Sequence, residues 1–477
     1  MPREVQLVGF DFGSTTSSAL VATAQLAENS VSRRVELRGV RERFRSEMVF
    51  TPFTDEGIDE QALERYLHQW LTAAGVQPEE IFGGGALVTG LAAQQANARA
   101  IGKVVRRAAG DALVATADDP CLESWLAFLG SCDALSRAHP QTAFVNLDIG
   151  GGTTNLALGQ AGQVLRTGCL FVGARHIQVE PGGYRIARLS HRGRLTLEQL
   201  GIARKVGSRL TPGEVDAVMD FYMQVIESEL GVADTALDAS LRQPYRQVAF
   251  RLPRDVHDYA VTLSGGVGEL VYAHLQGRPW PSTTQYGDLG IDLARRLVDS
   301  PRWSGHFRTY TPASGGRATV FGLLRYNTEV SGSTLYLPHP DRLPQVDIPL
   351  VGALSPEVSD EQLDYLLGFV RRSPRGGGLF VSLPGADAAA VRTLGQRIAA
   401  ACRARAFPAE HPIVLLMPEN LGNVLGQYAT EWGTMPLNLI VIDEIAARDA
   451  QYVQIGRLRD QVAPVSFYGL HEASGPD

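Results

Sequence analysis

Apolar and polar positions alternate through most of residues 5–50, in stretches such as VQLVGF, SALVAT and RRVELRGV. A period of two sends successive side chains to opposite faces of a sheet, so this part of the chain predicts a meander of strands. Residues 59–74 instead follow a helical period, which gathers one apolar face: Leu63, Leu67, Trp70 and Leu71. The pattern then predicts a strand at 86–89, a helix at 97–109, a strand at 112–117 and a helix at 120–129.

A second series of elements begins at residue 142. An apolar strand is followed by the run TNLALGQAGQVLRTGCLFVG, which predicts two further strands around a turn at residues 159–162. Thr211, Pro212 and Glu214 are typical of a helix start, so we expect a helix from there to about residue 230. The remaining predicted parts are a strand at 259–263, a helix at 285–299 and a closing segment at 318–330. Residues 180–208, rich in Gly and Arg, show no clear pattern.

From about residue 335 the composition changes, and prolines at 338, 340, 344, 349 and 356 predict a linker. Beyond it, strands at 378–384, 412–418 and 437–444 alternate with helices at 388–404 and 420–430, which predicts a small α/β unit with a parallel three-stranded sheet. Residues 452–467 are expected to add closing strands. We therefore expect domains at 1–140, 141–334 and 335–477, the last with a structural or partner-binding role because it carries no phosphate motif.

The chemistry that stands out is a glycine-rich turn in residues 145–158, VNLDIGGGTTNLAL. An apolar strand runs into Asp148, and a group of small residues follows it: Gly150, Gly151, Gly152, Thr153 and Thr154. Glycines let the backbone approach a ligand closely, and successive N–H groups form a nest for phosphate oxygens. Asp148 is placed where it could hold a magnesium ion through water. The alternative is a glycine-rich hairpin whose aspartate only caps its own turn.

The same pattern occurs once more, in residues 7–22. Asp11 follows an apolar strand and precedes a second set of small residues: Gly13, Ser14, Thr15 and Thr16. The two aspartates lie 148 − 11 = 137 residues apart, which is the spacing of a duplicated lobe and not of a short repeat.

A third glycine turn follows the predicted strand at 259–263. Its residues Ser264, Gly265 and Gly266 are candidates to line an adenosine, with Glu269 as a candidate for the ribose hydroxyls. Strand, turn and helix also begin any ordinary α/β crossover, and a glutamate at a helix start is commonly only exposed to solvent.

In this order and spacing, the three turns resemble the phosphate-one, phosphate-two and adenosine motifs of the actin, sugar-kinase and heat-shock-chaperone ATPase superfamily. Residues 317–322 (RATVFG) resemble the second connecting helix of that fold, and residues 86–90 (ALVTG) resemble the region of the first. The resemblance implies an α/β fold with two duplicated, ribonuclease H-like actin lobes, a nucleotide cleft between them and a small C-terminal α/β domain.

Within that superfamily, the sequence is similar to those of the reactivating factors of ethanolamine ammonia-lyase. The similar phrases are NLDIGGGTTNLAL, VTLSGGVGE, GRATVFG followed by SGSTLYL (331–337), and LIVIDEIAARDAQYVQIG (439–456). The similarity extends from Val8 to about Val465, and its last two phrases are specific because the general ATPase fold does not carry them.

The resemblance implies ATP or ADP bound with Mg²⁺, held by Asp11 and Asp148 from opposite walls. It also implies a chaperone-like, weakly hydrolysing protein that binds the cobalamin-bound lyase and lets damaged cobalamin exchange for intact adenosylcobalamin. One position departs from the family. Where those factors commonly read Thr-Gly-Glu, with a carboxylate that could orient the attacking water, this chain reads Thr89, Gly90, Leu91. Glu123 is the substitute we expect, although it is equally typical of a solvated helix residue.

Composition and charge limit the other kinds of function that this protein can have. The chain has 477 residues, too many for one core, and a net charge of −7 with no basic run, which argues against nucleic-acid binding. No apolar run has the length of a membrane span, and the chain enters a strand directly at its start. The cysteines lack metal spacing and suit reduced thiols: Cys121, Cys132, Cys169 and Cys402. We expect a cytoplasmic protein without membrane insertion; association with a bacterial microcompartment and oligomerisation stay open.

Two other functions stay open at this stage. A small-molecule kinase of the same fold needs a catalytic aspartate beside a substrate pocket, and no convincing candidate for it occurs. A non-hydrolysing, actin-like scaffold is compatible with Leu91, but no terminal amphipathic membrane helix supports it.

Overall fold

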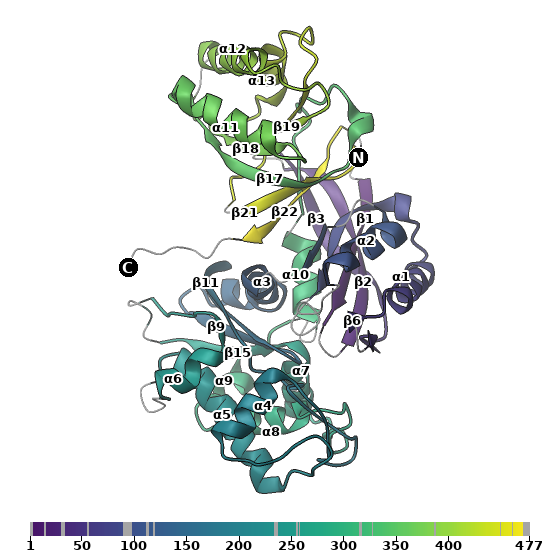
Figure 1. Ribbon diagram of the computed structural model, residues 1–477, viewed down its shortest axis with the longest axis vertical. Coiled ribbons are helices and arrows are strands. Elements are labelled where there is room, and N and C mark those ends of the chain that lie inside the picture. Colours follow the sequence, from purple (N-terminus) through teal and green to yellow (C-terminus); the bar gives the residue numbers. More distant parts are fainter. Residues whose placement is uncertain are drawn as a thin grey trace.

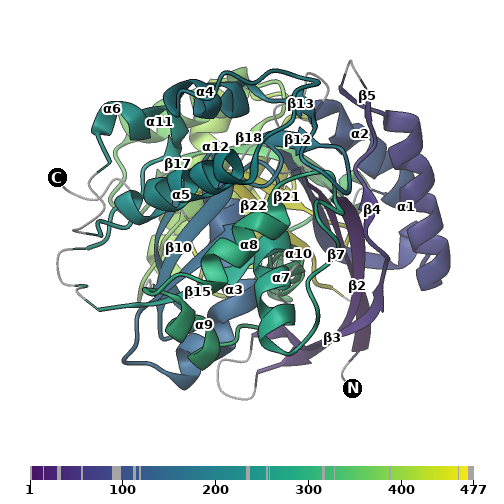
Figure 2. The same cartoon turned by 90° about the horizontal axis from the view of Figure 1, so that it is seen from below.

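The computed structural model describes most of the chain and arranges it in three parts (Figure 1). The described residues are 3–13, 16–29, 34–54, 57–88, 98–110, 114–117, 120–232, 237–253, 256, 258–313, 317–326, 328–385, 388–448, 450–459 and 461–470. Two lobes, purple to blue and teal, lie beside each other in the views of Figures 1 and 2, and a green and yellow C-terminal domain stands at one end of the molecule in Figure 1.

The first lobe is built on a six-stranded sheet in the order β3-β2-β1-β7-β8, with β4 added beside β2. The first three strands form an antiparallel meander, and β7 and β8 continue it in parallel from β1. The strands are β1 (Arg3–Phe12), β2 (Thr16–Glu28), β3 (Val35–Arg45), β4 (Val49–Phe50), β7 (Ile81–Val88) and β8 (Val114–Ala117); β5 (Phe53–Thr54) and β6 (Gly57–Ile58) form a separate hairpin.

Helices α1 (Glu60–Ala74) and α2 (Ala98–Ala109) cover one face of this sheet. Asp59 caps the start of α1 by accepting from the N–H of Ala62, and the apolar face predicted from the sequence is buried. A short 3₁₀ turn, η1 (Pro78–Glu80), leads into β7. The predicted order of strands and helices in this half is therefore confirmed.

The second lobe repeats the arrangement with a five-stranded sheet in the order β14-β11-β10-β9-β15. Strands β9, β10 and β11 form the meander, and β15 is parallel to β9 as β7 is to β1. The strands are β9 (Phe144–Ile149), β10 (Thr154–Gln160), β11 (Gln163–Leu170), β14 (Arg246–Val248) and β15 (Ala260–Ser264). The duplication inferred from the two glycine turns is confirmed by this common topology.

The remaining elements of the second lobe surround its core. Residues 180–208, where the sequence showed no clear pattern, contain the second strand of a hairpin and a helix. Thr211 caps α5 together with Glu214, as predicted. The elements are β12 (Ile177–Val179), β13 (Ile186–Leu189), α4 (His191–Gln199), α5 (Pro212–Glu229), α6 (Ala239–Arg242), η2 (Gln243–Tyr245), α7 (Gly265–Leu275), α8 (Gly290–Val298) and α9 (Ser304–Thr309).

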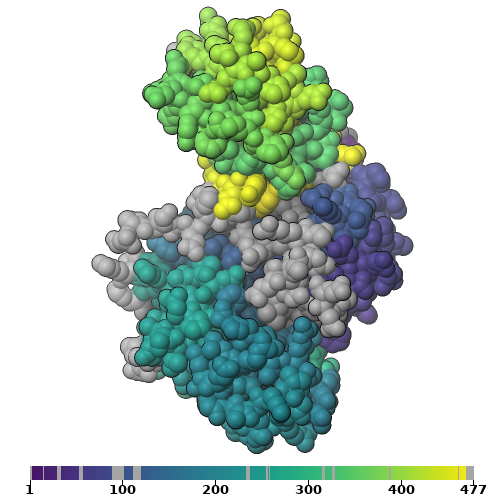
Figure 3. Space-filling model, viewed as in Figure 1, coloured from purple at the N-terminus to yellow at the C-terminus, as the bar shows by residue number. Residues whose placement is uncertain are grey.

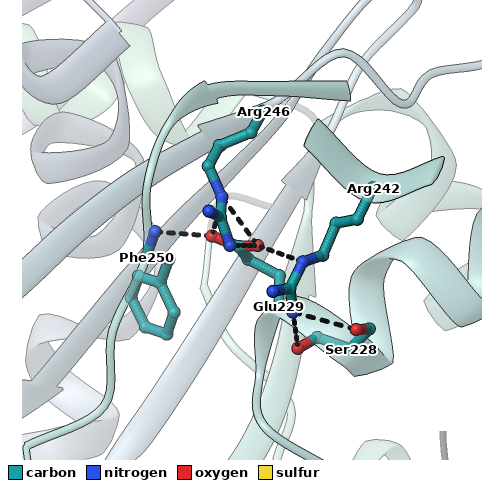
Figure 4. Close-up of polar contacts among 5 residues, drawn as sticks. All are labelled: Ser228, Glu229, Arg242, Arg246 and Phe250. Carbon is teal, nitrogen blue, oxygen red and sulfur yellow. Dashed lines mark hydrogen bonds and ion pairs between the residues drawn. The ribbon is translucent and has the colours of Figure 1, made fainter. Parts of the chain in front are cut away.

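A buried ion cluster ties the end of α5 to the edge strand β14 (Figure 4). The Glu229 side chain is fully buried and accepts from Arg246, with an Nη2–Oε2 distance of 2.7 Å, and from the N–H of Phe250 at 2.8 Å. Arg242 lies 3.9 Å from the same carboxylate and donates to the carbonyl of Ser228 at 2.9 Å. One buried negative charge thus faces two arginines.

Two connecting helices cross between the lobes, α3 (Pro120–Ala138) and α10 (Ala318–Tyr326). Each packs on the opposite half: α3 lies against β9, β10 and β11, whereas α10 lies against β1 and β7. Gly130 and Gly322 allow the crossing, because a Cβ on either would come closer than 3.0 Å to the main chain of the other helix. Residues 318–330 therefore do not simply close the second lobe, as the sequence suggested.

The C-terminal domain contains a seven-stranded sheet in the order β16-β22-β21-β17-β18-β19-β20. Its strands are β16 (Thr328–Val330), β17 (Gln345–Leu354), β18 (Gly377–Val381), β19 (Pro412–Leu416), β20 (Asn438–Ile442), β21 (Ala450–Ile455) and β22 (Pro464–Leu470). Its helices are η4 (Pro340–Arg342), α11 (Asp360–Arg372), α12 (Ala388–Ala404) and α13 (Gly422–Ala429). The three predicted strands β18, β19 and β20 are parallel, but the predicted three-stranded sheet is too small.

The predicted linker after residue 335 is also wrong, because β17 and α11 lie in it. Pro349 sits inside β17, where a proline removes a hydrogen-bond donor. Up to Pro349 this strand pairs with β21 in antiparallel register, and from Leu350 it pairs with β18 in parallel register. The proline stands where the strand changes partner and where the pairing is irregular, so the missing N–H is tolerated.

Together these observations give the fold class expected from the sequence: an α/β protein with two duplicated actin-like lobes and a C-terminal α/β domain. The C-terminal domain rests on the first lobe. Thr328 of β16 and Pro464 of β22 lie against Gly83 of β7, and Tyr468 packs with Leu87 and Leu323. The space-filling view in Figure 3 shows this domain, green and yellow, standing over the two lobes.

Candidate nucleotide-binding site

The two glycine-rich turns share one closing backbone hydrogen bond. The N–H of Gly13 donates to the carbonyl of Thr16 at 3.0 Å, and the N–H of Gly150 donates to the carbonyl of Thr153 at 2.9 Å. Asp11 ends β1 and Asp148 lies at the end of β9, each one residue before the last strand residue. Ser14 and Thr15 lie outside the described residues. The predicted equivalence of the two turns is thus visible in their hydrogen bonds.

Asp148 is buried and held on both sides. Its Oδ1 accepts from the hydroxyl of Ser264 at 2.7 Å, and its Oδ2 accepts from the hydroxyl of Thr319 at 3.5 Å. Burial raises the pKa of Asp148 to about 6, and the two hydrogen bonds oppose this change. Burial alone therefore favours the protonated carboxyl, and a bound cation would favour the ionised form.

Ser264 belongs to a chain of buried polar side chains. Its hydroxyl accepts from Nδ2 of Asn146 at 2.8 Å, and Oδ1 of Asn146 accepts from Thr262 at 3.1 Å. The Cys132 thiol of α3 lies 3.2 Å from the Thr262 hydroxyl. The Ser264 hydroxyl, predicted to line the adenosine, is therefore engaged with Asp148.

The neighbouring glycines differ in their surroundings. Gly265 has a φ of +75°, and a Cβ there would come closer than 3.0 Å to the Asp148 side chain and to the carbonyl of Ile149, so glycine is required. Around Gly266 a Cβ would meet nothing within 4 Å, and Glu269 on the same helix is exposed. This face of α7 is open, as a bound nucleoside requires.

The start of α10 brings the two halves of the site together. Thr319 contacts Asp148 of the second lobe, and the next residue, Val320, lies against Gly9 of β1, two residues before Asp11. A Cβ on Gly9 would come within 2.6 Å of the Val320 side chain. The ends of β1 and β9 thus flank one helix start, which is the arrangement expected if Asp11 and Asp148 face a common ligand.

Arg317 makes the same connection through charge. Its guanidinium is buried and donates to the carbonyls of Ser46 at 2.6 Å and Ala19 at 3.4 Å, both in the first lobe. Burial and the charge of Arg45 lower the pKa of Arg317, while the charges of Glu269, Glu42 and Asp11 raise it. Glu269 from the second lobe and Asp11 from the first therefore act on one buried arginine.

The sequence did not point to His176, which supports the second glycine turn. It is fully buried, with Nε2 at 2.8 Å from the carbonyl of Gly152 and Nδ1 at 2.8 Å from the hydroxyl of Ser190. The N–H of the next-door Arg175 donates to the carbonyl of Gly151 at 2.6 Å. Burial lowers the pKa of His176 to about 4, so the ring is neutral at physiological pH. A spacing of 24 residues from its partner hides this contact from local patterns.

Glu123 lies in the first turn of α3 and is half-buried. The hydroxyl of its neighbour Ser124 lies within hydrogen-bond distance of the carbonyls of Pro120 and Gly168, which anchors this turn to β11. Thr89, Gly90 and Leu91 lie outside the described residues. The role of Glu123 as a substitute base stays a prediction.

Two searches of the described residues limit other kinds of site. No group of three or more His, Cys, Asp and Glu side chains that could hold a metal ion occurs among them. Oδ1 of Asn155, which pairs with Asp148 across the hairpin, is buried and has no hydrogen-bond partner. A bound ligand or its water would supply the missing donor. None of the described helices is long and apolar enough to cross a membrane.

Known proteins resemble this sequence over nearly its whole length. The sequence model of the ethanolamine utilisation protein EutA family matches residues 3–470. The ethanolamine ammonia-lyase reactivase EutA of Escherichia coli (strain K12) is 30% identical over 487 residues, covering 98% of each chain. The protein of the same name from Salmonella typhimurium is 29% identical over 492 residues, again covering 98% of each. Among solved structures, an exopolyphosphatase-like protein aligns with a TM-score of 0.38 at 16% identity, covering 67% of this chain and 85% of that one. Because the family match spans almost the whole sequence, the chain belongs to the ethanolamine utilisation protein EutA family.

Proposed function

We propose that this protein is an ATP-dependent reactivating factor for adenosylcobalamin-dependent ethanolamine ammonia-lyase. It binds lyase that has lost the adenosyl group of its cofactor, releases the damaged cobalamin and lets intact cofactor rebind. Family membership supports the partner, since the curated relatives are named as reactivases of that lyase. The observation that supports the mechanism is that the start of α10 contacts Asp148 through Thr319 and packs through Val320 against Gly9, two residues before Asp11.

The site residues divide into three groups in this proposal. Asp11 and Asp148 would hold Mg²⁺ through water, and a bound ion would supply positive charge beside the phosphates. The turns hold the phosphates, through Gly13, Ser14, Thr15 and Thr16 on one side and Gly150, Gly151, Gly152, Thr153 and Thr154 on the other. Gly265, Gly266 and Glu269 contact the adenosine, and Ser264 orients Asp148.

Nucleotide acts through the connecting helices. Since α10 contacts Asp148 and also donates to carbonyls of the first lobe, a ligand that draws the two turns together moves this helix. The ligand shifts the balance of open and closed forms only by its different affinity for the two. The C-terminal domain, seated on the first lobe, transmits the movement to the lyase. We assign the protein to the cytoplasm. Hydrolysis is slow because Leu91 stands where the family commonly has a glutamate, and Glu123 is the candidate substitute base.

The test uses lyase blocked with a cobalamin that lacks the adenosyl group. We expect deaminase activity to return when this protein, ATP, Mg²⁺ and fresh adenosylcobalamin are added together, and not when ATP is left out. Asp11→Asn and Asp148→Asn should each reduce recovery at least tenfold, whereas Asp299→Asn, an exposed aspartate at the end of α8, should not.

Two outcomes would contradict the proposal. Phosphate passed from ATP to a small molecule in the absence of lyase would indicate a kinase. Tight nucleotide binding with no recovery of the lyase under any condition would indicate a scaffold. Single-turnover hydrolysis by Glu123→Ala separately decides whether Glu123 serves as the base.

A further inference from the structure

Three segments of the C-terminal domain that the nucleotide site does not explain meet at one place. Residues 331–334 follow β16, residues 419–420 follow β19, and residues 443–444 follow β20. Strands β18, β19 and β20 are parallel, so these residues lie at the carboxyl edge of a parallel sheet. Open α/β sheets bind their ligands outside the carboxyl ends of strands.

Asp443 lies at the centre of this cluster and is fully buried. Its Oδ2 accepts from the N–H of Gly422 at 3.3 Å and from the hydroxyl of Thr334. Its Oδ1 is buried and has no hydrogen-bond partner, and no ion pair with Asp443 occurs in the described part of the chain. A buried carboxylate oxygen without a donor is costly, so it calls for a proton or a cation.

The cluster contains more hydrogen-bond acceptor oxygens than hydrogens that can be donated to them. Nδ2 of Asn420 donates to Glu444 at 2.7 Å, which turns Oδ1 of the same amide toward Thr334. The Thr334 hydroxyl contacts both Asn420 Oδ1 and Asp443 Oδ2, but it carries one hydrogen and can donate it only once. One further oxygen of the group is thus left without a donor.

Gly332 shows that the two acidic side chains share one side of the cluster. A Cβ at Gly332 would come closer than 3.0 Å both to Asp443 Oδ1 and to the Cγ and Cδ atoms of Glu444. Glu444 also has a φ of +61°, a backbone conformation that a glutamate adopts only against its own preference. The Glu444 carboxylate is therefore held near the unpartnered oxygen of Asp443.

We propose that Asp443, Glu444, Asn420 and Thr334 bind one hard divalent cation of the calcium or magnesium class. Two carboxylates, an amide oxygen and a hydroxyl oxygen are the ligands that such ions prefer, and water completes their coordination. The cation joins the segment after β16 to the ends of β19 and β20. It is separate from the nucleotide site, and it does not depend on the proposed function.

The test uses the full chain with Asp11→Asn and Asp148→Asn, so that the predicted metal–nucleotide site is silent. The protein is treated with chelator, freed of nucleotide, and titrated with Ca²⁺ and separately with Mn²⁺ by calorimetry and thermal unfolding. We expect one ion per chain and a higher Tm in its presence. Adding Asp443→Asn should weaken binding at least tenfold, and adding Asp341→Asn, an exposed aspartate of the same domain, should leave it unchanged.

No saturable binding of either ion, or unchanged binding after Asp443→Asn, would overturn the proposal and leave Asp443 as a protonated structural residue. If Asp443→Asn fails to fold by circular dichroism, Asn420→Ala and Glu444→Gln decide instead, since neither residue is fully buried. Each should weaken binding at least threefold; unchanged binding in both would equally reject the site.

Discussion

His176 shows how a single side chain can fix the geometry of the site. The N–H of Gly193 donates to the hydroxyl of Ser190, which leaves that hydroxyl to donate to Nδ1 of His176. Nε2 then carries the ring hydrogen and donates to the carbonyl of Gly152. The ring is thus a neutral tautomer that links α4 to the second glycine turn, and protonation of Nδ1 would place a positive charge in a fully buried site and remove the acceptor of the Ser190 hydroxyl.

Replacing this ring should change how stability depends on pH. In the unfolded chain a histidine titrates near 6.5, and in the folded chain burial lowers the pKa of His176 to about 4. Between these values the unfolded state binds more protons, so this residue's stabilisation is complete above about pH 6.5 and is lost as pH falls toward 4. His176→Phe should cost about 2–3 kcal/mol at pH 7.5 through its unsatisfied partners. The natural chain loses free energy of unfolding as the pH falls to 4.5. The variant should lose about 2–3 kcal/mol less over the same range.

Urea unfolding at several pH values measures both effects. The matched control is His68→Phe, at an exposed position of α1, which should leave the pH profile unchanged. A His176→Phe profile parallel to that of the natural chain would show that this ring is not responsible for the acid sensitivity.

Glu229 is the second residue for which we predict how a substitution changes the stability of the fold. Its buried carboxylate faces Arg242 and Arg246, whose side chains remain about one quarter exposed (Figure 4). Glu229→Gln keeps the shape but leaves two positive charges partly uncompensated, which should destabilise the fold by about 2–4 kcal/mol. Glu36→Gln, which removes an exposed ion pair with Arg38, should cost less than about 1 kcal/mol in the same denaturation experiment. Equal effects would show that the Glu229 cluster behaves as an ordinary surface pair.

At the scale of elements, the crossing of α3 and α10 decides how the lobes communicate. Gly130 of α3 lies against the carbonyl of Ala318, and Gly322 of α10 lies against the carbonyl of Leu126. Both contacts are with main-chain atoms, which cannot move away by changing rotamer as a side chain can. The helices can therefore approach closely because each places a glycine against the backbone of the other. Each helix also packs on the sheet of the opposite lobe.

A methyl group at this crossing should push the helices apart. We expect Gly322→Ala to destabilise the protein by about 1–3 kcal/mol, because overpacking forces the backbone to move. It should also reduce ATP-dependent reactivation more than nucleotide affinity, if α10 transmits the movement. Gly213→Ala is the matched control: nothing lies within 4 Å of a Cβ there, and alanine in a helix should be neutral or stabilising by up to about 1 kcal/mol. Thermal unfolding and nucleotide titration of both variants distinguish the two positions.

At the scale of the whole molecule, the C-terminal domain and the first lobe share apolar surface. Val330 and Val462 lie in one cluster with side chains of β1, β2 and α10, and Tyr468 lies in another with Leu87 and Leu126. Strand β22 supplies Tyr468 to the second cluster and also pairs with β16 and β21. The two parts are therefore expected to unfold together.

Removing residues 464–470 and all that follows should expose this shared surface. We expect a lower Tm for the entire chain and self-association at micromolar concentration, because apolar patches of the first lobe lose their cover. Calorimetry and size-exclusion chromatography measure the two effects, with removal of residues 471–477 alone as the control. A truncated chain that keeps an unchanged transition for the two lobes would show that the C-terminal domain is an independent unit.

Local sequence was sufficient where a few neighbouring residues decide the structure. The order Asp, Gly and hydroxyl residues after an apolar strand predicted both turns, because a four-residue hairpin closes on its own hydrogen bonds. Thr211, Pro212 and Glu214 predicted the start of α5 for the same reason. Helix α12 was predicted with its observed limits, since its apolar period is uninterrupted.

Only the tertiary structure could decide what distant residues do to one another. Pro349 suggested a linker, and the strand it belongs to exists because two different partners pair with its two halves. Thr319 reaches Asp148 across 171 residues of sequence, and Arg317 reaches the first lobe across 271. Such contacts depend on how whole elements pack, which no local pattern encodes. The sequence determined which residue types follow each strand, and the packing of α10 decided that Thr319 contacts Asp148 of the second lobe while Val320 lies against Gly9 of the first.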